Sequence, residues 1–134
     1  MRKALLSLVF ILSTFCSFGQ SRADYEAAMT SFKKFYNDAK AESIKKLYGK
    51  GADMESAEKT WSAENMKELK EKYGGLKEFK YIGDKNEGKP ANLYKVEFEK
   101  STTVVGIYLD MEGKWLTFSF ENSSPSTERM MRAN

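Results

Sequence analysis

The chain has 134 residues, of which 41% are hydrophobic and 31% are charged, and its formal net charge is +3. It contains no histidine and one cysteine, Cys16, so the composition excludes Ser-His-Asp hydrolysis and metal sites built from imidazole. Without Arg2 and Lys3 the net charge falls to +1, which gives no electrostatic reason to expect nucleic acid or an anionic membrane as a partner.

Residues 1–19 have the pattern of an export signal peptide. The basic start is followed by an apolar stretch over 4–18, and Ser17-Phe18-Gly19 offers a small-x-small cleavage site before Gln20. The apolar stretch is about fifteen residues long, which is short for a bilayer span of roughly twenty. Two alternatives stay open: an uncleaved N-terminal anchor, and a lipoprotein modified at Cys16, although Phe15 stands where lipidation signals have a small residue.

Cleavage after Gly19 predicts an exported protein, periplasmic or secreted, without stable membrane insertion. Because cleavage also removes Cys16, the mature chain forms no disulfide and offers no thiol nucleophile or thiolate metal ligand. The absence of cysteine is typical of a bacterial envelope protein. We expect a single domain over 20–121 and a disordered tail over 122–134, which is rich in serine and has no apolar period.

Three helices are predicted in the first half of this domain. Apolar residues at three- and four-residue spacing predict the first helix at 22–36 and the second at 41–48. Residues 50–61 are polar and predict irregular structure. A third helix follows the N-cap Ser62 and ends at Gly74, which supplies a left-handed C-terminal residue.

The second half predicts four strands, at 76–82, 92–99, 102–109 and 114–120. Two-residue turns at Glu112-Gly113 and Lys100-Ser101 would connect the last three strands as an antiparallel meander. These turns bring apolar residues to one face, which the helices must cover, through the pairs Leu109–Leu116, Ile107–Phe118, Val105–Phe120, Val96–Val105 and Tyr94–Ile107. The predicted fold class is therefore α+β, with three N-terminal helices packed on one face of a curved four-stranded antiparallel meander.

Three bulky side chains fall on the opposite face in this register, namely Val104, Tyr108 and Trp115. Tyrosine and tryptophan are enriched at protein interfaces, so this face is a candidate surface for a homodimer or an envelope protein partner. The alternative is that Tyr108 and Trp115 cover one another on an open sheet, or lie under the C-terminal tail.

The order of these elements resembles the cystatin-like α+β cone of the nuclear-transport-factor-2-like superfamily. More narrowly, Phe35-Tyr36-Asn37 followed by Ile44-x-x-Leu47-Tyr48, and later by Tyr73-Gly74-Gly75 and the sheet, is similar to small exported domains of unknown function in that superfamily. The resemblance covers about residues 22–120. It implies a cone-shaped interior, in a superfamily that includes isomerases, dehydratases, binding modules and structural domains.

The predicted interior is aromatic and carries no acid. Such a cone could bind a small apolar ligand through Phe32, Tyr36, Tyr81, Tyr94, Phe98 and Phe118, or these rings could simply fill the core. Enzymes of the resembling superfamily use a carboxylate and a tyrosine, which here would require a loop acid such as Asp38 or Asp53.

The sequence therefore favours an exported, non-enzymatic binding or protein-interaction domain. The alternatives are a carrier of a small apolar ligand and, less favoured, a cone-type isomerase or hydratase. No cofactor, metal or nucleic acid is expected, because no phosphate-binding glycine loop or metal-ligand spacing is present.

Overall fold

The computed structural model describes residues 21–86 and 88–121, and it confirms the α+β class. Four helices come first, α2 (Arg22–Asn37), α3 (Ala41–Lys45), α4 (Met54–Thr60) and α5 (Ala63–Tyr73). Four strands follow, β1 (Leu76–Lys85), β2 (Ala91–Phe98), β3 (Thr102–Leu109) and β4 (Trp115–Glu121). The predicted signal peptide (1–19) and the predicted disordered tail (122–134) lie outside the described residues.

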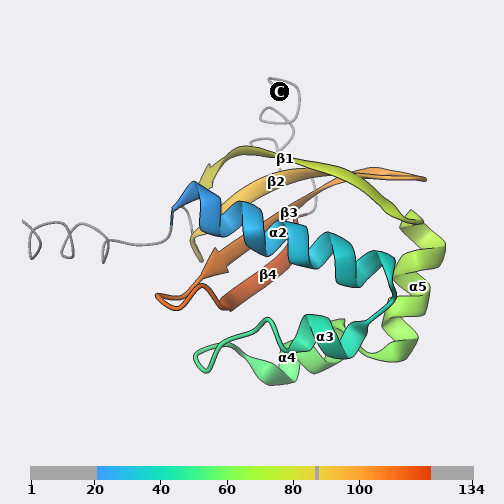
Figure 1. The fold of residues 1–134 in the computed structure, drawn as a ribbon, viewed down its shortest axis with the longest axis horizontal. Coiled ribbons are helices and arrows are strands. Elements are labelled where there is room, and N and C mark those ends of the chain that lie inside the picture. The colour runs from blue at the N-terminus through green and yellow to red at the C-terminus, as the bar shows by residue number, and fades with distance from the viewer. Residues whose placement is uncertain (1–20, 87, 122–134) are drawn as a thin grey trace, which may run out of the picture.

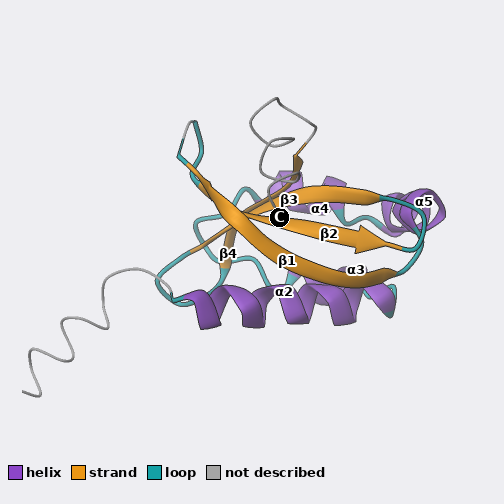
Figure 2. Cartoon of the chain, turned by 90° about the horizontal axis from the view of Figure 1, so that it is seen from above, coloured by secondary structure: helices purple, strands orange, loops and turns teal. Residues whose placement is uncertain are grey.

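The strands form one antiparallel sheet in the order β1-β2-β3-β4 (Figure 1). The sheet is curved, and α2 runs along its concave side (Figure 2). The helices α3 and α4 lie together below β4, and α5 lies at the C-terminal end of α2 (Figure 1).

The two long helices have the caps that their sequences predict. Ser21 and Asp24 form a capping box at the start of α2, and the Ser62 side chain accepts a hydrogen bond from the backbone N–H of Asn65 at the start of α5. Gly74 ends α5 with a φ of 75°, a conformation that glycine adopts without a steric penalty.

The segment 50–61, predicted to be irregular, contains the helix α4. Asp53 caps this helix by accepting a hydrogen bond from the backbone N–H of Ser56. Only Ala57 within the helix is buried, so the segment has no apolar stripe for periodicity to detect. The predicted helix over 41–48 is also shorter, because α3 ends at Lys45 and the residues after it pair with β4.

The predicted register of β2 against β3 is wrong by two residues. Tyr94 lies opposite Val105, and Val96 lies opposite Thr103. The tight turn is at Glu99-Lys100, where the Glu99 N–H donates to the Gly75 carbonyl and the Lys100 N–H donates to the Tyr73 carbonyl, at the junction between α5 and β1. A two-residue shift returns every side chain to the same face, so the apolar pattern could not distinguish the two registers.

The register of β3 against β4 is right at Ile107–Phe118 and Val105–Phe120, but Leu109 pairs with Trp115 instead of Leu116. The cause is a β-bulge next to Tyr108, together with a turn in which the Asp110 carboxylate accepts hydrogen bonds from two backbone N–H groups. The bulge reverses the facing of the first β4 residue.

Trp115 consequently lies in the main core, which corrects its predicted place on the outer face. Its side chain is 1% exposed, and its ring stacks on Phe118 with centroids 5.0 Å apart. Val104 does lie on the outer face, but it is buried in a small cluster with Ile82, Ala91 and Leu93. Tyr108, at 36% exposed, is the remaining accessible member of the predicted interface.

Aromatic rings fill the space between α2 and the sheet. Phe32, fully buried, contacts the rings of Trp61, Trp115 and Phe118 at centroid separations of 5.7, 5.9 and 4.8 Å. Edge-to-face and tilted ring pairs of this kind add to the stabilisation that burial alone provides.

The inward position of Trp115 can be tested by a pair of matched substitutions. We expect Trp115→Asp to lower the free energy of unfolding by at least about 4 kcal/mol, because losing a large core side chain costs about 3–5 kcal/mol and a buried unpaired carboxylate adds to that cost. Tyr108→Asp, the same polar change at an accessible position, should cost less than about 1 kcal/mol. Urea unfolding followed by far-UV circular dichroism measures both, and equal losses would contradict the structure.

Candidate functional site

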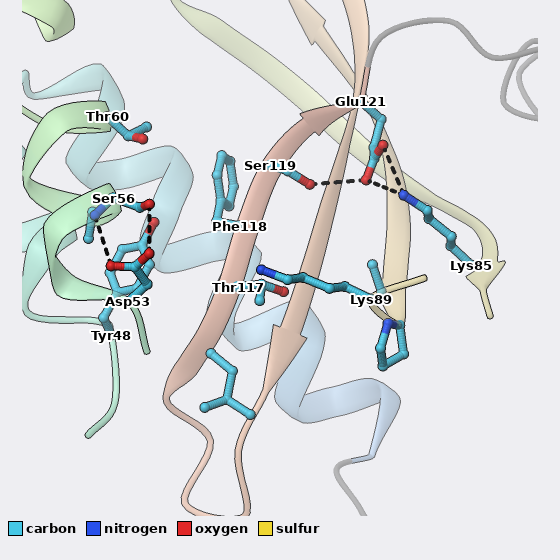
Figure 3. Close-up of a pocket in the computed structure, with 14 residues that line it drawn as sticks. Tyr48, Asp53, Ser56, Thr60, Lys85, Lys89, Thr117, Phe118, Ser119 and Glu121 are labelled. Carbon is cyan, nitrogen blue, oxygen red and sulfur yellow. Dashed lines mark hydrogen bonds and ion pairs between the residues drawn. The ribbon is translucent and has the colours of Figure 1, made fainter. Parts of the chain in front are cut away.

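A cleft of about 390 Å³ lies between α4 and the sheet edge that β4 forms. Its helix side is formed by Tyr48 and the exposed face of α4, and its other side by the length of β4 from Leu116 to Glu121. The hairpin between β1 and β2 supplies a third side, where Lys89 extends toward β4 (Figure 3).

The outer edge of β4, on the side away from β3, is paired along only a small part of its length within the described residues. Trp115 donates its backbone N–H to Leu47 at 2.8 Å and accepts a hydrogen bond from the Gly49 N–H at 2.9 Å. These two bonds make one rung of a parallel ladder, centred on Tyr48. The chain then turns away into α4. Within residues 21–86 and 88–121, no strand pairs with the outer edge of β4 beyond this rung.

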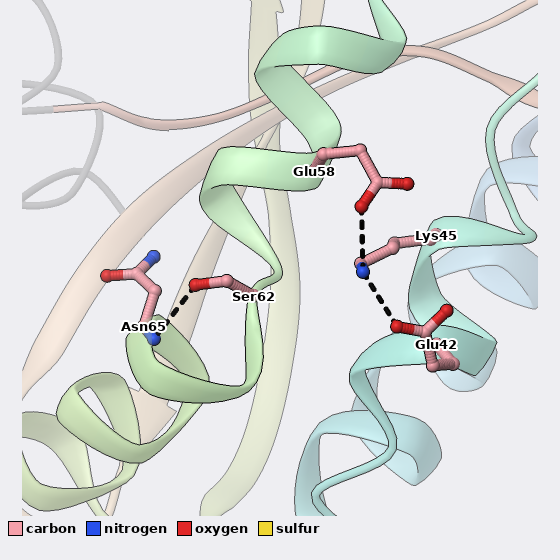
Figure 4. A network of polar contacts seen from close by, with 5 residues as sticks. All are labelled: Glu42, Lys45, Glu58, Ser62 and Asn65. Atoms are coloured by element: carbon pink, nitrogen blue, oxygen red, sulfur yellow. Dashed lines mark hydrogen bonds and ion pairs between the residues drawn. The ribbon is translucent and has the colours of Figure 1, made fainter.

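The helix side of the cleft is held in place by polar contacts between helices. The Lys45 ammonium lies 2.7 Å from Glu42 in α3 and 2.9 Å from Glu58 in α4, so it ties the two helices together (Figure 4). Trp61, directly after α4, donates its indole N–H to the Tyr48 hydroxyl at 2.9 Å. Both contacts lie at the C-terminal end of α4 and tie it to residues 45–48, the segment that leads into the hydrogen bonds with β4.

Four ionisable groups that line the cleft, Tyr48, Asp53, Lys85 and Glu121, have partners within the protein. Backbone and side-chain hydrogen bonds from Ser56 lower the pKa of Asp53, which keeps this carboxylate ionised. Glu121 accepts a hydrogen bond from the Ser119 hydroxyl at 3.0 Å and lies 3.4 Å from the Lys85 ammonium. Burial raises the pKa of Tyr48 to about 12, an effect that the Trp61 N–H partly offsets.

The six predicted ligand-binding residues do not gather around this cleft. Phe118 lines it, whereas Phe32, Tyr36, Tyr94 and Phe98 are buried in the main core and Tyr81 packs against that core. The tyrosine hydroxyls, predicted as ligand contacts, bind other protein groups: Tyr36 donates to the Gly74 carbonyl and Tyr81 to Asp84, and Tyr94 accepts from Arg22.

Arg22, which the sequence analysis did not single out, lies over the open end of this aromatic cluster. Its guanidinium is 3.5 Å from the centre of the Tyr81 ring and donates to the Tyr94 hydroxyl at 2.8 Å and to Asn92 at 2.7 Å.

The two loop acids considered for catalysis lie outside the aromatic core. Asp38 is an exposed C-cap of α2, and Asp53 caps α4 at the β4 cleft.

The cleft could not be found from the sequence. Its one local signal is Asp53 three residues before Ser56, which is a capping pattern and predicts the start of a helix. Which strand forms the sheet edge, and which helix lies beside it, depend on tertiary contacts between segments far apart in the chain.

Three further observations bear on the kind of site. Among the described residues, no group of three or more acidic or cysteine side chains is arranged to hold a metal ion. No helix within the described ranges is long and apolar enough to cross a membrane. No protein-family model matches the chain, and neither curated proteins nor solved structures include a significant match to it.

The raised pKa of Tyr48 predicts a loss of stability at alkaline pH. Folding favours the protonated form of this hydroxyl. Its contribution to the free energy of unfolding is therefore fully present below the ordinary tyrosine pKa of about 10 and is lost as the pH rises to about 12. We expect the free energy of unfolding of Tyr48→Phe to fall less steeply between pH 10 and 12 than that of the unmodified chain. At pH 7 the same variant should be less stable by about 1–2 kcal/mol, because the buried Trp61 N–H loses its acceptor.

Chemical denaturation at a series of pH values measures both effects. Tyr36, whose pKa burial also raises to about 12, supplies a second variant, Tyr36→Phe, with the same expected direction. If the free energy of unfolding of both variants depends on pH as that of the unmodified chain does, these two hydroxyls do not have the raised pKa values that we assign to them.

Proposed function

We propose that this protein is a non-enzymatic binding domain that takes up an extended segment of another polypeptide along the outer edge of β4. The observation that carries the proposal is the combination of two features: a strand edge that no described strand pairs beyond Trp115, and a cleft that runs beside this edge. An extended peptide that adds a strand to such an edge gains main-chain hydrogen bonds, and the flanking side chains select its sequence.

The rung at Trp115 indicates the geometry of such an addition. Leu47 and Gly49 already bond to β4 as an added strand would, but only at its first residue. This rung closes one end of the edge, so a bound segment would lie beside Leu116–Glu121, a length of about 20 Å at roughly 3.3 Å per residue.

The walls of the cleft favour a peptide with alternating side chains. On the side of the cleft next to α4, Phe118 and Ala57 offer apolar contacts. On the other side, Thr117 and Ser119 offer hydroxyls, and Lys89 adds a positive charge. Successive side chains of a strand point to opposite faces, so an apolar–polar alternation would suit both sides.

The non-enzymatic assignment is supported by the state of the polar groups. The chain has no histidine, and Asp53 and Glu121 in the cleft are each bound to neighbouring groups of the protein. Export through residues 1–19 stays a prediction and would make the bound polypeptide an extracytoplasmic one. The kinship with the nuclear-transport-factor-2-like superfamily likewise stays a proposal, which the helices-first order and the open four-stranded sheet support.

A phage-displayed library of linear heptapeptides provides a probe for this function. We expect selected peptides to alternate apolar and polar residues and to protect the amides of Leu116–Glu121 from hydrogen exchange when bound. Ser56→Trp, which fills the cleft from α4, should weaken the binding of a selected peptide at least about tenfold, or about 1.4 kcal/mol.

Lys59→Trp is the matched control, because Lys59 lies on the same helix, is exposed and does not line the cleft. This variant should bind the peptide within about twofold of the unmodified chain. The proposal fails if the library yields no binder, if the protected amides lie elsewhere, or if the two tryptophan variants bind equally.

A further inference from the structure

A second hollow, of about 770 Å³, lies between the start of α3 and one face of α5, and it shares no lining residue with the β4 cleft. We refer to it as the α3–α5 groove. Its volume falls within the roughly 300–1,000 Å³ typical of small-molecule sites.

The α3–α5 groove concentrates positive charge. Four lysines line it, Lys40, Lys67, Lys70 and Lys100, against two glutamates, Glu42 and Glu71. The lining residues thus carry a formal charge of +2, while the whole chain from residue 20 carries +1.

Two of these lysines are held in defined positions. The Lys100 ammonium donates to the backbone carbonyl of Glu71 at 2.8 Å, and the Lys70 ammonium donates to the carbonyl of Asn37 at 3.3 Å and lies 4.9 Å from the centre of the Tyr36 ring. No carboxylate among the described residues lies within ion-pair distance of either group. Each ammonium has three donors, so each keeps donors for a ligand while its position is fixed.

One of the two glutamates contributes less to the groove than its charge suggests. The Glu42 carboxylate binds Lys45 at 2.7 Å, and Lys45 is not a lining residue (Figure 4). The Glu42 carboxylate is therefore engaged at the contact between α3 and α4, where Lys45 also pairs with Glu58.

The remaining surface of the groove is mainly apolar and small. Ala39, Ala41 and Ala63 line it beside the buried Met66. Ala39 has a φ of 55°, a left-handed conformation in which glycine is the usual residue. The Ala39 methyl group adds apolar surface to the groove, at the backbone cost that this conformation carries for a residue with a Cβ.

We propose that the α3–α5 groove binds a free single-chain carboxylate of the fatty-acid class. The carboxylate head lies against Lys70 and Lys100, and the alkyl chain lies over Met66 and the alanines. A polar anion alone would leave the apolar surface unused, and an uncharged chain would leave the lysines unpaired.

Laurate, kept below its critical micelle concentration, is a suitable probe for the full chain. We expect saturable binding by isothermal titration calorimetry, with amide shift changes in nuclear magnetic resonance spectra confined to residues 39–43, 63–71 and 100. Acetate has the head without the chain, and dodecyl maltoside has the chain without the negative charge. Each should bind at least about tenfold more weakly than laurate.

Two double variants separate the proposed contact from a general charge effect. Lys70→Gln/Lys100→Gln should weaken laurate binding at least about tenfold, and Lys70→Arg/Lys100→Arg should retain it. The matched control Lys50→Gln/Lys114→Gln changes the net charge equally at exposed positions outside the groove and should bind within about twofold of the unmodified chain.

The shift map of the unmodified chain decides the question even where a variant loses stability. The proposal is overturned if laurate does not saturate, if the shifts map outside the groove, or if dodecyl maltoside binds as tightly as laurate. Binding to phosphatidylglycerol vesicles without binding of monomeric laurate would also overturn it, because the ligand would then be a lipid surface.

Discussion

The two backbone hydrogen bonds of Trp115 and the burial of its indole are the constraint on which the rest of the structure depends. The indole packs against Phe32 and Phe118 at the centre of the core, while the backbone of the same residue binds Leu47 and Gly49. Gly49 is required at this contact, since a Cβ there would lie 2.9 Å from the Lys114 Cβ and closer still to the Asp110 carboxylate. One residue thus joins the sheet edge, the segment after α3 and the aromatic interior.

This anchor also explains why the β4 edge is both accessible and bounded. Because the segment 47–49 leaves the sheet after one rung, α4 stands away from β4 and a cleft remains between them. An unpaired strand edge invites aggregation, and proteins commonly protect such edges with charges and flanking loops. Here the Lys85–Glu121 pair and the β1–β2 hairpin border the edge at one end and the Trp115 rung closes the other. The edge is therefore limited to a short segment, which suits the binding of one extended peptide and disfavours indefinite strand addition.

Local patterns predicted much of this fold, and each failure has its own physical cause. The stripe of α2, the N-cap Ser62, Gly74 and the alternation of β2 each depend on neighbouring residues, and the structure contains all of them. The helix α4 was not predicted, because a helix that buries one alanine has no periodic apolar pattern in its sequence. Trp115 was misplaced because a bulge reverses facing without altering composition. The cleft and the α3–α5 groove form between segments distant in sequence, so no local pattern contains either of them.

Net charge alone does not describe how charge is distributed over this protein. The chain from residue 20 is almost neutral, yet four lysines line one groove, while Lys45 pairs with Glu42 and Glu58 at the contact between α3 and α4. With no histidine, and with the pKa of Asp53 lowered and that of Tyr48 raised, these groups keep one protonation state around neutral pH. The binding that we propose for the β4 cleft and the α3–α5 groove would then depend on fixed charges, strand geometry and apolar surface, and not on a change in the protonation of these groups.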